Sequence, residues 1–73
     1  QDPGEEVVRL YRAAAANGIA SAEYNLGVIL EGRGAADEAL AAFGRACHLQ
    51  PSNAQGQPPV FKQKYLYVRA LLP

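Results

Sequence analysis

Apolar side chains recur at the spacing of a helix along the first part of the chain, with polar residues between them. The first stripe comprises Val7, Leu10, Tyr11 and Ala14. Ahead of it, Asp2 can cap a helix whose first turn contains Pro3, and Glu5 stands three residues after the cap, as in a capping box. Asn17-Gly18 closes the helix, because glycine adopts the left-handed conformation without steric cost. The pattern therefore predicts a helix over about residues 3–16.

Two more helices are expected from two further apolar stripes. One runs over residues 21–32 with Ser21 as its N-cap, and the other runs over residues 36–49, after which Pro51 prevents continuation. The stripes are Ala22, Leu26, Ile29 and Leu30 in the first of these helices, and Ala39, Leu40, Phe43, Ala46 and Cys47 in the second.

The turn Gly32-Arg33-Gly34 between these two helices is short, so the helices must lie antiparallel and pack closely. Gly27 offers the small surface that a close approach needs, with Ala39 and Ala42 available on the facing helix. The sequence therefore predicts an all-α fold built around an antiparallel helical hairpin.

The C-terminal part of the chain differs in composition from the rest. A run of turn and breaker residues ends near residue 59 and divides the chain into a helical segment, 1–57, and a basic amphipathic segment, 58–73. Pro59 can start a fourth helix that caps the hairpin, with Lys62 and Arg69 facing away from its apolar stripe. That stripe is Phe61, Tyr65, Val68 and Leu72. An extended strand is the competing interpretation, because apolar and aromatic residues also alternate over residues 65–70.

Charge and composition exclude several classes of function. The 7 basic and 7 acidic residues of the 73-residue chain cancel, so nucleic acid is not an expected partner. No apolar run approaches the ~20 residues of a membrane span. The basic segment could lie on an anionic membrane or bind an acidic partner, but its three cations are few for membrane binding, and a capping helix is the preferred interpretation. A chain this small has a thin stability margin, so an oligomer or contact with the rest of a parent chain is expected.

The only cysteine, Cys47, and the only histidine, His48, leave no internal disulfide and no zinc-ligand set, and no cofactor is expected. These neighbours point about 100° apart on a helix, which does not suit a nucleophile and its base. Gly32-Arg33-Gly34 follows a helix and lacks the ending of a phosphate-binding loop. The chain is therefore not expected to be an enzyme, and one reduced cysteine is compatible with a cytoplasmic setting.

Residues 20–53 resemble a tetratricopeptide repeat, because Leu26-Gly27, Ala39, Phe43 and Pro51 are in register with that 34-residue signature. Glu23 stands in the Trp position of the signature, and Leu30 stands in the Tyr position. Upstream, residues 11–18 followed by 20–27 resemble the related Sel-like repeats, as does Gly32-Arg33-Gly34. The resemblance covers about residues 5–54 and implies a hairpin with one helix on each side, taken from a longer α-solenoid.

The resemblance also implies a function, namely the binding of another protein as a scaffold, adaptor or co-chaperone-like module. If helix 21–32 buries its apolar stripe, its other side carries Ser21, Tyr24, Asn25 and Val28, which would lie on the concave face of such an array. The Asn25 amide can both donate to and accept from an extended peptide backbone. The alternative is a non-catalytic structural segment of a larger enzyme or assembly, whose surfaces are all used internally.

Overall fold

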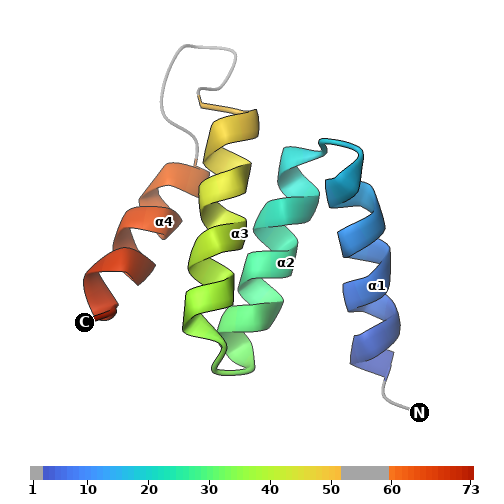
Figure 1. Cartoon of the computed structure of the whole chain (residues 1–73), viewed down its shortest axis with the longest axis horizontal. Coiled ribbons are helices and arrows are strands. Elements are labelled where there is room, and N and C mark those ends of the chain that lie inside the picture. Colours follow the sequence, from blue (N-terminus) through green and yellow to red (C-terminus); the bar gives the residue numbers. More distant parts are fainter. Residues whose placement is uncertain (1–2, 52–59) are drawn as a thin grey trace.

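The computed structural model describes residues 3–51 and 60–73, and all the regular structure in these ranges is helical. The helices are α1 (Pro3–Ala16), α2 (Ala20–Gly32), α3 (Ala36–Leu49) and α4 (Val60–Leu71). They lie next to one another in chain order, and α1, α2 and α3 alternate in direction (Figure 1). The predicted all-α fold is confirmed for the described residues, and the extended interpretation of residues 65–70 is wrong because α4 covers them.

The turns depend on glycine where the backbone becomes left-handed. Gly18 follows α1 with a φ of 80°, and Gly34 lies between α2 and α3 with a φ of 81°. Both glycines lie in turns that the sequence predicted. The Asn17 amide donates to the Ala13 carbonyl at 3.1 Å and ties down the end of α1. The predicted cap at Ser21 is wrong: α2 begins at Ala20, and Ile19 takes the N-cap position without a side-chain hydrogen bond. The predicted cap at Asp2 lies outside the described residues.

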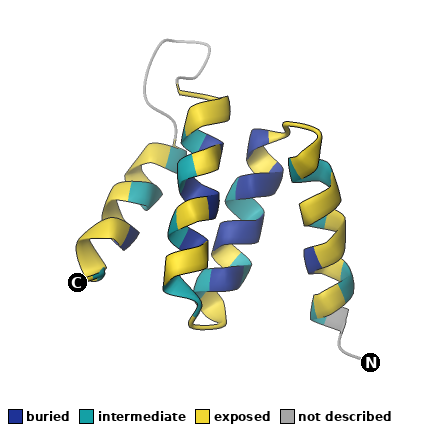
Figure 2. Ribbon diagram, in the orientation of Figure 1, coloured by how far each residue is buried: buried dark blue, intermediate teal, exposed yellow. Residues whose placement is uncertain are grey.

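The α2–α3 hairpin contains most of the core (Figure 2). Its buried apolar residues are Ala20, Ala22, Leu26, Leu30, Ala39, Ala42, Phe43 and Ala46. The ring of Phe43 lies directly on Gly27, where an added Cβ would come within 2.6 Å of the ring. The close approach predicted at Gly27 is therefore confirmed, although its nearest partner is the Phe43 ring rather than the facing alanines.

The predicted apolar stripe of α1 is wrong in part. Leu10 is 60% exposed and Val7 is 41% exposed, whereas the neighbouring Val8 is only 6% exposed and joins the core. Tyr11 is half-buried against that core, as predicted. Two adjacent valines permit two helical registers about 100° apart. The contact with α2 selects the register that contains Val8.

Helix α4 packs along α3 through the stripe that the sequence predicted. Val68 is buried, Phe61, Tyr65 and Leu72 are half-buried, and Lys62 and Arg69 are exposed. Lys64 forms an ion pair with Glu31 of α2 at 2.9 Å, and this hydrogen bond raises the pKa of the Lys64 ammonium above its ordinary value. Among the described helices, none has both the length and the apolar character to cross a membrane.

Candidate binding surfaces

The four residues predicted to face a partner occupy different environments on α2. Ser21 and Val28 are exposed, Asn25 is half-buried between them in sequence, and Tyr24 is half-buried toward the neighbouring helices. We refer to Ser21, Asn25 and Val28 as the α2 strip. These positions share one side of the helix because they are spaced by three or four residues.

Tyr24 is separated from the α2 strip by its contacts. Its ring centroid lies 5.5 Å from that of Phe43 on α3 and 5.1 Å from that of Phe61 on α4, with tilted ring planes. Aromatic pairs in this distance range stabilise by about 0.5–1.5 kcal/mol beyond the area that they bury. Tyr24 therefore joins three helices, and part of the surface predicted for a partner is covered by the C-terminal helix.

The Asn25 amide remains available on the α2 strip. Within the part of the chain that the structure describes, its side chain has no hydrogen bond, and it is not among the polar groups shut off from solvent. Leu26 beside it is 1% exposed, so the helix that carries the amide is held firmly from the opposite side. A half-buried amide without an internal partner, on a fixed helix, can pair with a peptide group that approaches from outside.

A second polar feature, on the opposite side of α2, was not predicted from the sequence. Glu23 is only 6% exposed, and its Oε2 accepts a hydrogen bond of 2.9 Å from Nε of Arg45 on α3. The other oxygen, Oε1, is buried and has no partner in the described part of the chain. An open groove of about 600 Å³ lies beside this carboxylate, walled by small residues of α1 and α3 that include Ala15, Ala41 and Gly44.

Glu23 was noticed in the sequence only as an acid in an aromatic position of the repeat signature. The signal that could have identified its partner was Arg45, which lies on the facing helix of the predicted hairpin. The Arg45 side chain is 52% exposed, whereas that of Glu23 is 7% exposed, so the ion pair joins a buried carboxylate to a solvent-exposed guanidinium. Removal of Arg45 would leave the buried Glu23 carboxylate unpaired, which is destabilising.

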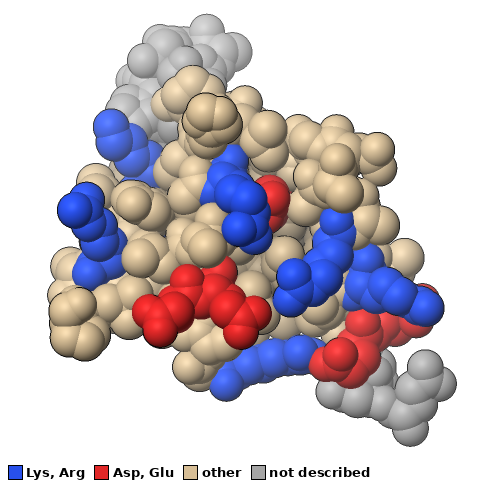
Figure 3. Space-filling view, viewed as in Figure 1, with Lys and Arg blue, Asp and Glu red and all other residues tan. Residues whose placement is uncertain are grey.

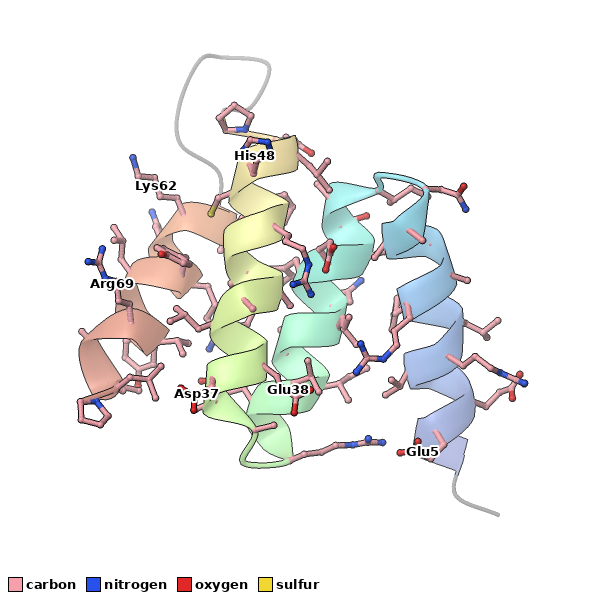
Figure 4. The ribbon with its side chains drawn as sticks, in the orientation of Figure 1. Glu5, Asp37, Glu38, His48, Lys62 and Arg69 are labelled. Carbon is pink, nitrogen blue, oxygen red and sulfur yellow. The ribbon has the colours of Figure 1, made fainter. Side chains whose placement is uncertain are left out.

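A third surface is a groove of about 570 Å³ between α3 and α4. We call it the α3–α4 groove and define it by Cys47 and His48 of α3 and by Lys62, Tyr65, Leu66 and Arg69 of α4. Lys62 and Arg69 project outward from α4, and His48 lies at the C-terminal end of α3 (Figure 4). Neither Lys62 nor Arg69 forms an ion pair with any described residue.

No ion pair joins the acidic residues of α3 to the described cations of this groove. Asp37 and Glu38 are at the N-terminal end of α3, opposite to the end that carries His48 (Figure 4). Elsewhere the two signs of charge are interspersed over the face that Figure 3 shows, with no large area of one sign. The α3–α4 groove is thus bordered by cations that no described carboxylate neutralises.

The chemistry of Cys47 is that of a packed thiol. Burial raises the pKa of the thiol above its ordinary value, and the nearby Lys62 ammonium opposes that rise only in part. A raised pKa lowers the fraction of reactive thiolate at neutral pH. Within residues 3–51 and 60–73, no three His, Cys, Asp or Glu side chains are grouped so that they could hold a metal ion.

Comparison with known proteins adds no assignment. The chain matches no protein-family model, no curated protein and no solved structure.

Proposed function

We propose that the chain is a protein-interaction module whose α2 strip receives an extended segment of a partner protein. The observation that carries this proposal is the Asn25 amide, which is half-buried, reaches solvent and has no hydrogen bond to a described residue. Peptide backbones present N–H and C=O groups that one amide can satisfy together, without a demand on the partner's side chains.

The neighbours of Asn25 suit the same occupant. Val28 is 43% exposed one turn away, where it can contact an apolar side chain of the partner. Ser21 is exposed one turn in the other direction and offers a hydroxyl. An extended segment about five residues long would contact all three side chains, since its ends lie about 13 Å apart and the strip spans about 10 Å.

We further propose that α2 and α3 form a repeat of the tetratricopeptide or Sel-like type within an α-solenoid. This proposal is supported by the contact of Gly27 with Phe43 and by the burial of Leu26 and Ala39, the positions that carry the resemblance. The outer side of α1 also exposes apolar residues, Val7 and Leu10. Neighbouring repeats would cover these residues, as stacked units do in a solenoid.

A structural role within a larger assembly is the second candidate, and a specific contact favours it. Phe61 of α4 covers Tyr24, so the chain itself occupies part of the α2 surface. In that case the α2 strip would face another part of the same assembly, and no separate partner segment would bind there.

Substitution of Asn25 distinguishes the two candidates. Proteins retained by the immobilised chain from an extract of the source cells would be identified, and the affinity of one purified partner would be titrated. Asn25→Ala should weaken binding by about five- to a hundredfold, since it leaves a partner's peptide group unpaired. Helicity by circular dichroism should not change, because surface substitutions alter stability by about 0.5 kcal/mol or less.

The matched control is Gln63→Ala, which removes an exposed amide from α4 rather than from α2. It should leave the affinity unchanged. Equal affinities for the wild type and Asn25→Ala, at equal helicity, would remove Asn25 from the interface and favour the structural role.

A further inference from the structure

We propose that the α3–α4 groove binds an acidic segment of a partner protein, in which an apolar side chain lies between two carboxylates. The groove shares no residue with the α2 strip, so this is a second site and does not depend on the first. Its ligand chemistry follows from three features: unpaired cations, an apolar wall between them, and their spacing.

The charge of the groove selects an anionic ligand. Lys62 and Arg69 border it, and no described residue neutralises either of them. Lys64 on the same helix is different, because it is engaged by Glu31. Helix α4 therefore divides its basic residues into one that holds the fold together and two that remain available.

The wall between the cations is apolar. Leu66 is 50% exposed and lies between Lys62 and Arg69 in the chain, while Tyr65 is half-buried beside it. An exposed leucine flanked by cations can contact an apolar side chain while the cations bind flanking carboxylates. A ligand with charge alone would leave Leu66 in water, so the preferred segment carries both kinds of group.

The spacing is suited to an extended chain. Arg69 is seven positions after Lys62 in the helix, which places their backbones about 10 Å apart on one side of α4. In an extended peptide, the first, third and fifth side chains face the same way and span about 13 Å. Glutamates at the first and fifth positions and leucine at the third would meet Lys62, Arg69 and Leu66 within the reach of their long side chains.

A second copy of the chain is a poorer occupant. Its exposed acidic pair, Asp37 and Glu38, has adjacent carboxylates with no apolar residue between them, and no large apolar residue of α3 before Leu49 is exposed. Glu5 and Glu6 are already paired with Arg33 and Arg9. An anionic membrane is also disfavoured, because two free cations around a concave groove give little attraction to a flat surface.

The probe is a fluorescein-labelled peptide, Glu-Thr-Leu-Thr-Glu, titrated by fluorescence anisotropy with the 73-residue chain. Two matched peptides accompany it: Gln-Thr-Leu-Thr-Gln lacks the charge, and Glu-Thr-Ser-Thr-Glu lacks the apolar side chain. The first peptide should bind most tightly, and its affinity should fall as salt rises from low to physiological concentration, since exposed charges are screened.

The protein variants locate the site. Arg69→Glu should lower the affinity for the acidic peptide about tenfold, because one attraction is replaced by a repulsion. Arg12→Glu, an equal charge change at an exposed position of α1, should have no effect. The double variant Lys62→Glu, Arg69→Glu should instead prefer Lys-Thr-Leu-Thr-Lys. Because Cys47 lines the groove, the acidic peptide should also slow alkylation of Cys47 by iodoacetamide.

Several results would overturn the proposal. Equal effects of Arg69→Glu and Arg12→Glu would show attraction to overall charge only. Binding of phosphatidylserine vesicles, lost in Arg69→Glu, without binding of any peptide would assign the surface to lipid. Self-association in sedimentation that Arg69→Glu abolishes, again without peptide binding, would assign it to a second copy.

Discussion

Helix α1 and each helix of the α2–α3 hairpin have similar numbers of apolar residues but bury them to different extents. In the hairpin, Leu26 is 1% exposed and Phe43 is fully buried. Among the described side chains of α1, Val8 is the one large apolar residue that is buried, while Leu10 is 60% exposed. The hairpin is stabilised from inside by its own two helices. Helix α1 packs mainly against α2.

This difference shows that an apolar stripe on a helix stabilises the fold only where a second helix covers it. The hairpin has small residues at the point of closest approach, so its two stripes meet and exclude water. Helix α1 has a neighbour on one side only, and its exposed ion pair between Glu5 and Arg33 adds little, since such pairs contribute about 0–1 kcal/mol. Substitutions should therefore have large effects in the hairpin and small effects in α1.

The largest effect is expected at Phe43. Phe43→Ala should lower the free energy of unfolding by about 3–5 kcal/mol, because it empties the centre of the hairpin. Urea denaturation followed by circular dichroism measures the loss. Should this variant not fold at all, Phe43→Leu should fold with a smaller loss. Wild-type stability in Phe43→Ala would show that the hairpin is not the main source of stability.

A smaller loss is expected at Gly27. A Cβ at this position would lie within 2.9 Å of three Phe43 ring atoms, so Gly27→Ala should cost about 1–3 kcal/mol through overpacking. Gly32→Ala is the matched control, since a Cβ there meets no atom within 4 Å. The control should be neutral or slightly stabilising, by about 0.4–1 kcal/mol. Thermal unfolding of both variants checks the contrast, which equal melting temperatures would contradict.

The smallest effects are expected in α1, where two adjacent valines test the helical register. Val8→Ala should cost about 1–2 kcal/mol, because it removes buried methyl groups from the edge of the core. Val7→Ala should cost about 0.5 kcal/mol or less, since Val7 is 41% exposed. A larger loss for Val7→Ala than for Val8→Ala in chemical denaturation would show that Val7 faces the core, as the sequence alone favoured.

The sequence was sufficient for the hairpin because periodicity, glycine turns and small residues all indicate the same arrangement there. It was insufficient for α1, since Val7 and Val8 are chemically equal and only the contact with α2 distinguishes them. Helix and strand were both compatible with residues 65–70 until the contacts of Phe61 and Val68 with the hairpin were known. The local pattern restricts the secondary structure and the helical register that a segment can adopt. Tertiary contacts decide between those that fit the pattern equally well.

The candidate surfaces also divide into features that the local pattern predicts and features that depend on tertiary contacts. Ser21, Asn25 and Val28 lie on one side of α2 as predicted, because helical spacing alone determines this. The position of Tyr24 against Phe61 could not be predicted, since it depends on how α4 docks. The ion pair of Glu23 with Arg45 and the α3–α4 groove likewise exist only after α3 has packed against its neighbours.

Hydrogen exchange of the backbone amides, measured by NMR on the 73-residue chain, tests most directly the claim that stability resides in the α2–α3 hairpin. Amides around Leu26 and Phe43 should exchange only through global unfolding, whereas those of α1 should exchange through local opening at a lower free energy. Protection factors in the hairpin should be at least about tenfold above those of α1. Equal protection of α1 and the hairpin, with the same dependence on denaturant, would contradict it.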